Sequence, residues 1–375
     1  MFKYIVGIIV LIAASAGAYW YSMQPEPPTH PPIVIEPQVS EPVSIVAENL
    51  DIPWDIAFLP EGLPGQGGML VTERTGSLLH IKQDKSVTEV PLKRSEVRGE
   101  GGLLGIVLHP NFKNSRFVYL YMSAQAADGT ENRVERYRFE NSTLSDERLI
   151  IGGIPGATYH DGGRMAFGPD GKLYITTGDA TRGQIAQDKS SLGGKILRLN
   201  DDGSIPSDNP FGNAVWSYGH RNPQGLAWDS GGRLWETEHG PTGEQNLCCR
   251  DEINLIEKGG NYGWPVITGD QIQTGMRTPV LHSGAKTVWA PASAVVVGDK
   301  MYFGGLLGRA LYEVTLGENG VTNLKEHFKN EFGRIRTVRM GPDGFLYLTT
   351  SNRDGRGDPV AEDDRIIRVD PKSLD

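Results

Sequence analysis

A short strand phrase recurs along this chain and restricts its fold more than any other feature. Residues 171–177 read Gly-Lys-Leu-Tyr-Ile-Thr-Thr, and close copies follow at 232–237 and 344–350. Weaker copies lie at 68–72, 116–121 and 299–303. Each copy carries a leucine or aromatic residue at the same position: Leu70, Tyr119, Tyr174, Trp235, Tyr302 and Tyr347. These positions are about 55 residues apart, a spacing compatible with propeller blades that carry loop insertions. Six copies predict an all-β chain folded as a six-bladed β-propeller.

The bulk composition agrees with a strand-rich, loop-rich protein. The chain has 375 residues, 48 of them glycine, and no stretch of a dozen residues shows a convincing helical period of apolar side chains. Short strands of this kind need a closed ring or barrel to protect their edges. We therefore expect the strand at 365–369 to pair with one near 43–48 and close the ring. The net charge of -9 argues against a nucleic-acid partner.

The N-terminus has the pattern of a targeting segment. Lys3 precedes an apolar run over 4–14, and small residues follow at 16–18. Residues 1–23 are therefore predicted to be a signal peptide or an N-terminal anchor, residues 24–43 a Pro-rich linker, and residues 44–375 the propeller domain. Both alternatives predict a periplasmic or otherwise extracytoplasmic protein, and the second also predicts tethering to a membrane.

The two cysteines, Cys248 and Cys249, are adjacent. An oxidising compartment permits a disulfide. A vicinal bridge, a bridge to another chain and two free thiols are the alternatives that the sequence leaves open.

Two loop phrases carry candidate groups for acid–base chemistry and anion binding. His160, in a loop before a strand, is a candidate general base, although a lone loop histidine commonly has no such role. Arg221, Asn222 and Gln224 place a guanidinium and two amides in one turn, where the arginine can bind a carboxylate or quinone oxygen. The alternative is a blade-linking turn whose arginine pairs with a structural aspartate.

Two further phrases suggest ion binding. Asp251 and Glu252, with the backbone carbonyls near Gly240, Pro241 and Tyr262, offer the oxygen ligands that calcium prefers. No EF-hand spacing is present, so on spacing alone an ordinary acidic loop is the better interpretation.

Arg334 and Arg336 alternate onto one face of a strand. Two cations on one face repel unless an anion lies between them, which makes a small polyanionic ligand plausible. Two surface arginines on an edge strand are the alternative.

An ordered set of phrases resembles a known family. The residues quoted for it lie at 99–105, 160–164, 197–206, 219–225, 238–241, 251–254, 259–265 and 334–336. Together they resemble the soluble quinoprotein aldose sugar dehydrogenases of the glucose/sorbosone dehydrogenase family, over nearly everything after about residue 45. Any one phrase is of modest specificity, whereas the ordered set is highly specific.

The resemblance implies a six-bladed propeller that uses pyrroloquinoline quinone (PQQ) and calcium to oxidise an aldose to its lactone. It implies that His160 is the general base, and that Arg221 stabilises charge developing on the quinone. The residues implied at the cofactor are Glu100, Arg221, Asn222, Arg334 and Arg336. The residues implied at calcium are Gly240, Pro241, Glu252 and Tyr262. The electron acceptor is unknown.

The chain departs from the family at three points. Glu100 stands where relatives often have glutamine, Leu307 takes the place of a cofactor-contacting lysine with Arg309 nearby, and the loop before Arg250 is longer. The departures at Glu100 and Leu307 motivate one alternative, a non-catalytic sugar-binding propeller. A second alternative is a calcium-dependent lactonase-type hydrolase on the same architecture, although a neutral lactone offers no anion to Arg334 and Arg336.

Overall fold

The protein is described by a computed structural model over residues 41–62, 67–93, 95–127, 129–244, 247–318 and 320–374. One compact unit spans Pro42–Asp375. The predicted signal peptide or anchor at 1–23 and nearly all of the predicted linker at 24–43 lie outside the described residues. Within the described residues, no helix has the length and apolar character needed to cross a membrane.

Six antiparallel sheets of four strands make up this unit. One contains β2 (Pro53–Phe58), β3 (Met69–Glu73), β4 (Leu78–Ile81) and β5 (Val87–Val90). The next contains β6 (Leu103–Leu108), β7 (Phe117–Ala126), β8 (Gly129–Glu140) and β9 (Thr143–Pro155). The third contains β10 (Met165–Phe167), β11 (Leu173–Thr177), β12 (Lys195–Leu199) and β13 (Val215–Tyr218).

The fourth sheet contains β14 (Pro223–Trp228), β15 (Leu234–Glu238), β16 (Glu252–Ile256) and β17 (Leu281–His282). The fifth contains β18 (Pro291–Val297), β19 (Lys300–Gly305), β20 (Ala310–Gly317) and β21 (Gly320–His327). The sixth combines β22 (Ile335–Met340), β23 (Leu346–Thr350) and β24 (Ile366–Val369) with β1 (Val43–Ala47). The described helices are short: α2 (Phe112–Ser115), η1 (Gly183–Ala186) and η2 (Pro371–Leu374).

The predicted six-bladed propeller is confirmed, and so is the way its ring closes. The N-terminal strand β1 pairs antiparallel with the C-terminal strand β24, with Val43 opposite Val369. The repeated leucine or aromatic position falls on the second strand of every sheet, and all six of these side chains are buried. The repeat in the sequence is therefore the repeat of the blade, because each blade needs one large apolar side chain at this point of its core.

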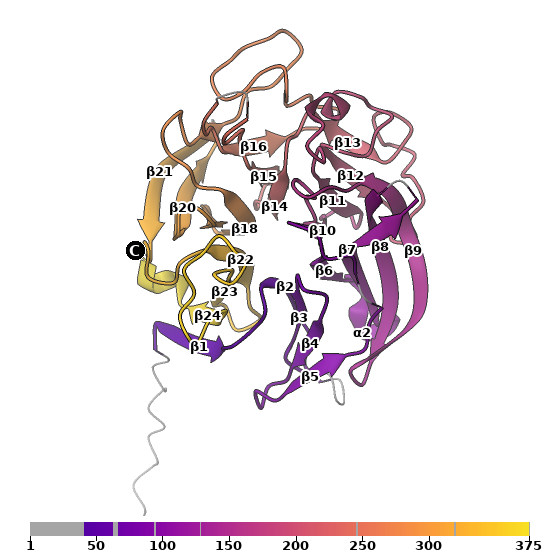
Figure 1. The fold of residues 1–375 in the computed structure, drawn as a ribbon, viewed down its shortest axis with the longest axis vertical. Coiled ribbons are helices and arrows are strands. Elements are labelled where there is room, and N and C mark those ends of the chain that lie inside the picture. The colour runs from indigo at the N-terminus through magenta and orange to yellow at the C-terminus, as the bar shows by residue number, and fades with distance from the viewer. Residues whose placement is uncertain are drawn as a thin grey trace, which may run out of the picture. The chain divides into compact units, whose positions relative to one another are not determined.

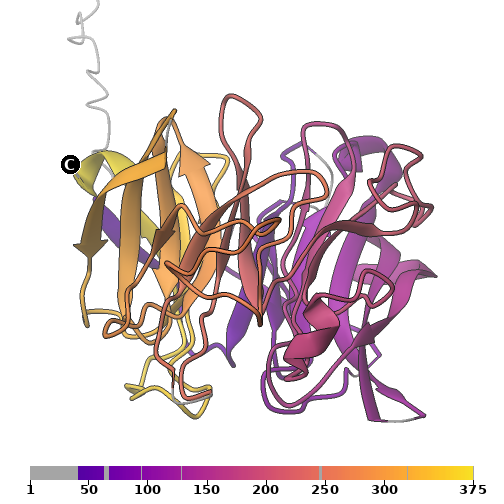
Figure 2. The same ribbon diagram turned by 90° about the horizontal axis from the view of Figure 1, so that it is seen from above.

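The first strands of the six blades surround the axis of the ring (Figure 1). Seen at right angles to the first view, the antiparallel blade strands lie roughly along a common axis, and their connections gather at the two ends (Figure 2). In an antiparallel sheet, the start of the first strand and the end of the second strand lie at the same end, as the pairing of Pro223 with Glu238 illustrates. Residues just before a first strand and just after a second strand therefore meet at one end of the axis.

A buried ion network ties three blades together near the axis. Asp55 on β2 accepts hydrogen bonds from Arg339 on β22 and lies 2.7 Å from the guanidinium of Arg164, which precedes β10. Burial opposes ionisation of Asp55, but the two arginines hold its pKa below the usual value. The guanidinium of Arg164 also lies over the ring of Trp54, 4.3 Å from its centroid. These contacts fix the inner strands on which the candidate site is built.

Candidate active site

A cavity of about 330 Å³ opens at the end of the axis where the first strands begin. Five of the predicted residues line it: Glu100, His160, Arg221, Gly240 and Asp251. A smaller space adjoins it and is lined by Trp54, Gln224 and Arg336, with Glu100, His239 and Arg356 shared between the two. The predicted residues Asn222, Pro241, Glu252, Tyr262 and Arg334 do not line the larger cavity.

His160 is held in a defined orientation in this cavity. Its Nδ1 lies 2.7 Å from Oδ1 of Asp179, and the second carboxylate oxygen of Asp179 accepts a hydrogen bond from the indole of Trp264 at 2.7 Å. The backbone of His160 has a φ of 65°, and its amide donates to Glu100. Because a carboxylate oxygen of Asp179 accepts from Nδ1–H, the lone pair of the imidazole is placed on Nε2. This nitrogen lies 3.4 Å from Glu244 at the cavity wall.

Arg221 lies beside His160, and Glu244 links the two side chains. The guanidinium of Arg221 donates to the same Glu244 carboxylate and to the carbonyl of His239. Its backbone amide donates to Glu238, which fixes the turn before β14. The arginine is thus buried with a local counter-ion in the cavity, where an incoming anion would compete with Glu244.

Arg334 and Arg336 have an anion of the chain between them. Asp354, in the loop after β23, accepts from Nε and Nη2 of Arg334 and lies 3.9 Å from Arg336. Burial opposes ionisation of Asp354, but the two arginines keep its pKa below the usual value. The sequence argument required an anion between these cations, and Asp354 meets that requirement without a ligand. Arg336 still faces the smaller space, where it donates to Gln224.

Glu100 is paired rather than free. Its carboxylate accepts from Arg356 at 2.7 Å and from the His160 amide at 3.0 Å. Burial opposes ionisation of Glu100. The positive charges of His239 (when protonated) and of Arg356, together with these hydrogen bonds, outweigh burial and lower the pKa of Glu100 to about 2. Arg356 therefore offsets the extra negative charge noted in the sequence.

Leu307, at the position where the resemblance implies a lysine, is exposed and lines the cavity. The neighbouring Arg309 instead pairs with Asp358 at 2.7 Å and does not line the cavity. Arg356, which lies far from Leu307 and Arg309 in the sequence, contributes a positive charge to the cavity lining in their place.

The sequence analysis did not identify five residues of the site: Asp179, His239, Glu244, Asp354 and Arg356.

His239 lies between the two spaces, and its Nε2 is buried without a hydrogen-bond partner among the described residues. Burial, aided by the cations of Arg221 and Arg336 and opposed by Glu100, lowers its pKa to about 3. A neutral imidazole with a free nitrogen therefore faces the cavity near neutral pH. Its position directly before Gly240 was the available signal.

The Gly240 segment is tightly packed around backbone oxygens. A side chain at Gly240 would collide with the carbonyl oxygens of Cys249, at 1.8 Å, and Arg250, at 2.5 Å. The Gly240 amide donates to Asp251, whose second carboxylate oxygen accepts from the amides of Trp289 and Ala290. Burial raises the pKa of Asp251.

Cys248 and Cys249 form a disulfide, one of the three alternatives left open by the sequence.

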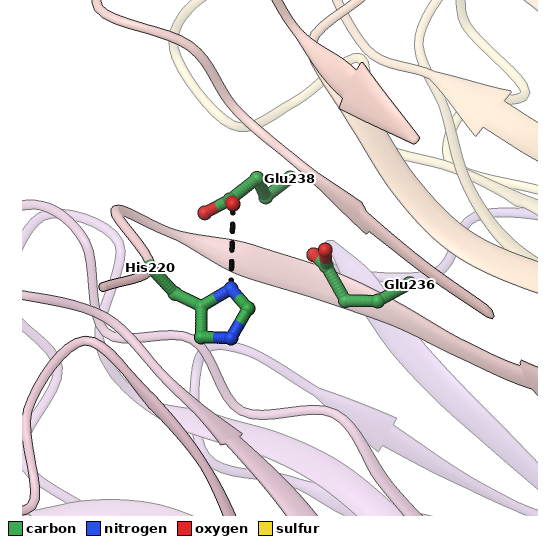
Figure 3. Close-up of side chains that lie close together, drawn as sticks. All are labelled: His220, Glu236 and Glu238. Atoms are coloured by element: carbon green, nitrogen blue, oxygen red, sulfur yellow. Dashed lines mark hydrogen bonds and ion pairs between the residues drawn. The ribbon is translucent and has the colours of Figure 1, made fainter. Parts of the chain in front are cut away.

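Behind this segment lies a buried acidic cluster on β15 and β16. Asn254 donates through one amide nitrogen to Glu236, Glu238 and Glu252. The imidazole Nδ1 of His220 points toward Glu238 at 3.3 Å, and the ligand atoms of His220, Glu236 and Glu238 lie within 4.8 Å of one another (Figure 3).

Two oxygens of this cluster, Oε1 of Glu236 and Oδ1 of Asn254, are buried without partners among the described residues. Burial and Glu238 raise the pKa of Glu252 to about 8 and that of Glu236 well above its usual value. Tyr262 is adjacent, with its ring stacked on His220 at 4.7 Å between centroids. The cluster has the chemistry of a hard-cation site, because unsatisfied carboxylate oxygens favour such ions.

The fold and the cavity define a class of protein: a six-bladed propeller with a polar axial site that contains a carboxylate-bound histidine beside an arginine. Residues 50–367 match the family described as Glucose / Sorbosone dehydrogenase. The chain belongs to this family, and it is an oxidoreductase of this kind.

Known relatives agree with this assignment. Aldose sugar dehydrogenase YliI of Escherichia coli K12 is 34% identical over 367 residues, which cover 88% of this chain and 93% of that protein. Quinoprotein glucose dehydrogenase B of Acinetobacter calcoaceticus is 36% identical over 267 residues, 62% of this chain and 54% of that protein.

Among solved structures, the PQQ-bound aldose sugar dehydrogenase of Streptomyces coelicolor superimposes with a TM-score of 0.79 at 36% identity, covering 87% of this chain and 97% of that one. A gluconolactonase of Xanthomonas campestris has a TM-score of 0.51 at 11% identity, which shows a shared fold alone.

Proposed function

We propose that this protein oxidises aldoses at the anomeric carbon to lactones, with PQQ as cofactor, calcium as the associated ion and His160 as general base. The family and the named activities of its relatives support the aldose as substrate. The observation that carries the residue assignment is the contact of His160 with Asp179 beside a cavity lined by Arg221.

In this proposal His160 receives the proton of the anomeric hydroxyl at Nε2. Asp179 holds the opposite nitrogen and stabilises the imidazolium that forms. The anomeric carbon loses its hydrogen as hydride, the bond from that carbon to its former hydroxyl oxygen becomes the lactone carbonyl, and the ring oxygen remains as the ester oxygen. PQQ, when bound, supplies the acceptor for that hydride. Arg221 is placed to balance negative charge that develops in the cavity.

The residues of the cavity fit a flat anionic cofactor. Arg221, Arg336 and Arg356 surround it with positive charge, and the unpartnered Nε2 of His239 offers a neutral polar contact. The negative charge of Glu100 is offset by its ion pair with Arg356. A carboxylate-bearing ligand would replace Glu244 as the partner of Arg221.

The oxygen-rich surroundings of Gly240 and Glu252 fit calcium. The carbonyls of Gly240 and Pro241 are proposed ligands of the cofactor-associated ion, next to the carboxylate of Asp251. Glu252 and the carbonyl of Tyr262 are proposed ligands of a second ion, because the adjoining cluster leaves two buried oxygens unsatisfied.

We also propose a periplasmic or otherwise extracytoplasmic location, on the basis of the N-terminal pattern at 1–23. Cell fractionation of the full-length chain tests it, and retention of the protein in the cytoplasm would refute it. A membrane-bound fraction would favour the anchor over the cleaved signal peptide.

Reconstitution of the apoprotein tests the activity. Purified protein is incubated with PQQ and calcium, and an aldose panel is assayed by dye reduction in parallel with His160→Ala. The proposal predicts a quinone absorbance on the protein and sugar-dependent turnover that His160→Ala loses. Lactone hydrolysis without PQQ would instead support the hydrolase. Absence of both PQQ binding and turnover would support the non-catalytic propeller.

A further inference from the structure

A groove adjoins the candidate active site where β8 begins and β9 ends. It has a volume of about 680 Å³, and its lining includes residues 153–157 together with Arg98, Thr130, Glu131 and Arg182. Tyr159 lines both this groove and the cavity that contains His160. The groove therefore begins one residue away from the proposed general base. We call it the Tyr159 groove.

The floor of the Tyr159 groove is preformed. The amide of Gly156 donates to the carbonyl of Thr130, and the amide of Gly153 donates to the carboxylate of Glu131. The side chain of Asn132 bridges the carbonyl of Pro155 and the carboxylate of Asp161, the residue after His160. These polar groups are already ordered before a ligand binds, so binding requires little loss of conformational entropy in the groove.

Tyr159 forms a braced aromatic wall between groove and cavity. Its side chain is 46% exposed, and the guanidinium of Arg356 lies 5.4 Å from the centroid of its ring. Arg356 is fixed by Glu100, whose own amide donates to the carbonyl of Thr158. An exposed aromatic ring held in place beside polar groups offers an apolar face with oriented hydrogen bonds around it, as small-molecule sites commonly do.

The charge of the Tyr159 groove differs from that of the whole chain. The chain has a net charge of -9, yet two arginines and one glutamate are the charged side chains that line the groove. Arg98 and Arg182 are exposed, and neither side chain has an ion pair or hydrogen bond among the described residues. Two unpaired guanidiniums in one concavity favour a ligand that carries a carboxylate.

We propose that the Tyr159 groove binds the second sugar of an oligosaccharide whose reducing end reacts at His160, and that it favours a sugar carrying a carboxylate. This inference rests on the proposed function, since it assumes that the reducing-end aldose occupies the cavity. The cavity of about 330 Å³ is at the small end of ligand sites, so further sugars need a separate space. A reducing sugar reacts at its anomeric carbon and is extended through its other hydroxyls, so its chain can leave the cavity past Tyr159.

Matched substrates test the proposal on the reconstituted full-length protein. Cellobiose is compared with cellobiouronic acid, and maltose with its uronic-acid counterpart, so that each pair differs by one carboxylate. Glucose is the single-sugar reference. We expect kcat/KM for the acidic member of at least one pair to exceed that of the neutral member about tenfold, the effect of one charge-assisted contact. This advantage should shrink as salt is raised.

Substitution of Arg98 and Arg182 gives a second test of the proposal. In Arg98→Gln/Arg182→Gln, the ratio of kcat/KM between acidic and neutral disaccharides should fall to about one. Arg277→Gln, which removes an exposed arginine paired with Glu257 and absent from the groove lining, is the matched control and should preserve the ratio. Equal rates for acidic and neutral members of both pairs, or a ratio unchanged in the double variant, would overturn the proposal.

Calorimetric titration of the acidic disaccharides into apoprotein separates this proposal from the proposed function. Binding that is lost in the double arginine variant supports the groove even if no sugar is oxidised. Turnover of glucose without any binding or rate advantage for the acidic disaccharides would support the oxidase activity and refute the groove.

Discussion

The imidazole Nδ1 of His160 lies 2.7 Å from the carboxylate Oδ1 of Asp179, and both side chains are buried. His160 precedes β10 and Asp179 follows β11, so the hairpin of one blade brings them together. This geometry leaves Nε2 as the basic nitrogen at the cavity, which is the arrangement that a general base requires.

Asp179→Asn is therefore expected to lower kcat by about 10²–10⁴-fold, because the amide no longer selects the tautomer with a basic Nε2. PQQ binding, measured by absorbance titration, should change little. His282→Ala, which breaks an exposed pair with Asp270, is the control and should keep full activity. A variant with wild-type kcat would show that Asp179 has no part in the reaction.

Glu244→Gln is expected to strengthen PQQ binding about tenfold, equivalent to about 1.4 kcal/mol. The Glu244 carboxylate is the ion-pair partner of Arg221 in the cavity and would compete with an anionic ligand. Calorimetric titration of PQQ in the presence of calcium measures the change. The same titration of Asp358→Asn, a carboxylate outside the cavity, controls for net charge. Unchanged or weaker affinity in Glu244→Gln would contradict the displacement.

Asp354→Asn is expected to destabilise the apoprotein by about 3 kcal/mol, because it leaves two buried guanidiniums without their shared anion. Chemical denaturation measures the loss. If PQQ carboxylates take over this role, saturating PQQ should raise the melting temperature of the variant more than that of the wild type. An equal shift in both proteins would place the cofactor away from this pair.

The pH dependence of stability should contain a contribution from Glu73. Burial raises the pKa of Glu73 to about 7, above its ordinary value of 4.5. Between these two values the native state retains a proton that the unfolded state has released, so the free energy of unfolding falls as the pH rises. The total is on the order of 3 kcal/mol, complete near pH 7.

Glu73→Gln should remove this part of the slope, as measured by urea denaturation from pH 4 to pH 8. Glu318→Gln, at an exposed position between β20 and β21 of another blade, should retain it. Parallel stability curves for the wild type and Glu73→Gln would disprove the assignment.

The sequence alone determined the architecture. A strand phrase repeated six times specifies six equivalent hairpins, and period-two strands with exposed edges are stable when the ring closes. The same sequence pointed to His160 and Arg221, because each lies in a distinctive loop phrase, and both prove to line one cavity. The predicted ion ligands Glu252 and Tyr262 instead lie beside a buried acidic cluster.

The partners of these residues were decided by the tertiary structure. Glu100 and Arg356 are separated by 256 residues and form an ion pair, and Asp354 lies between two arginines that the sequence left without an anion. No local pattern records such contacts, because they arise where loops of different blades converge on one axis. Periodicity is a property of the chain and can be read along it, whereas the charge balance of the site depends on which loop ends the closed ring brings within a few ångströms.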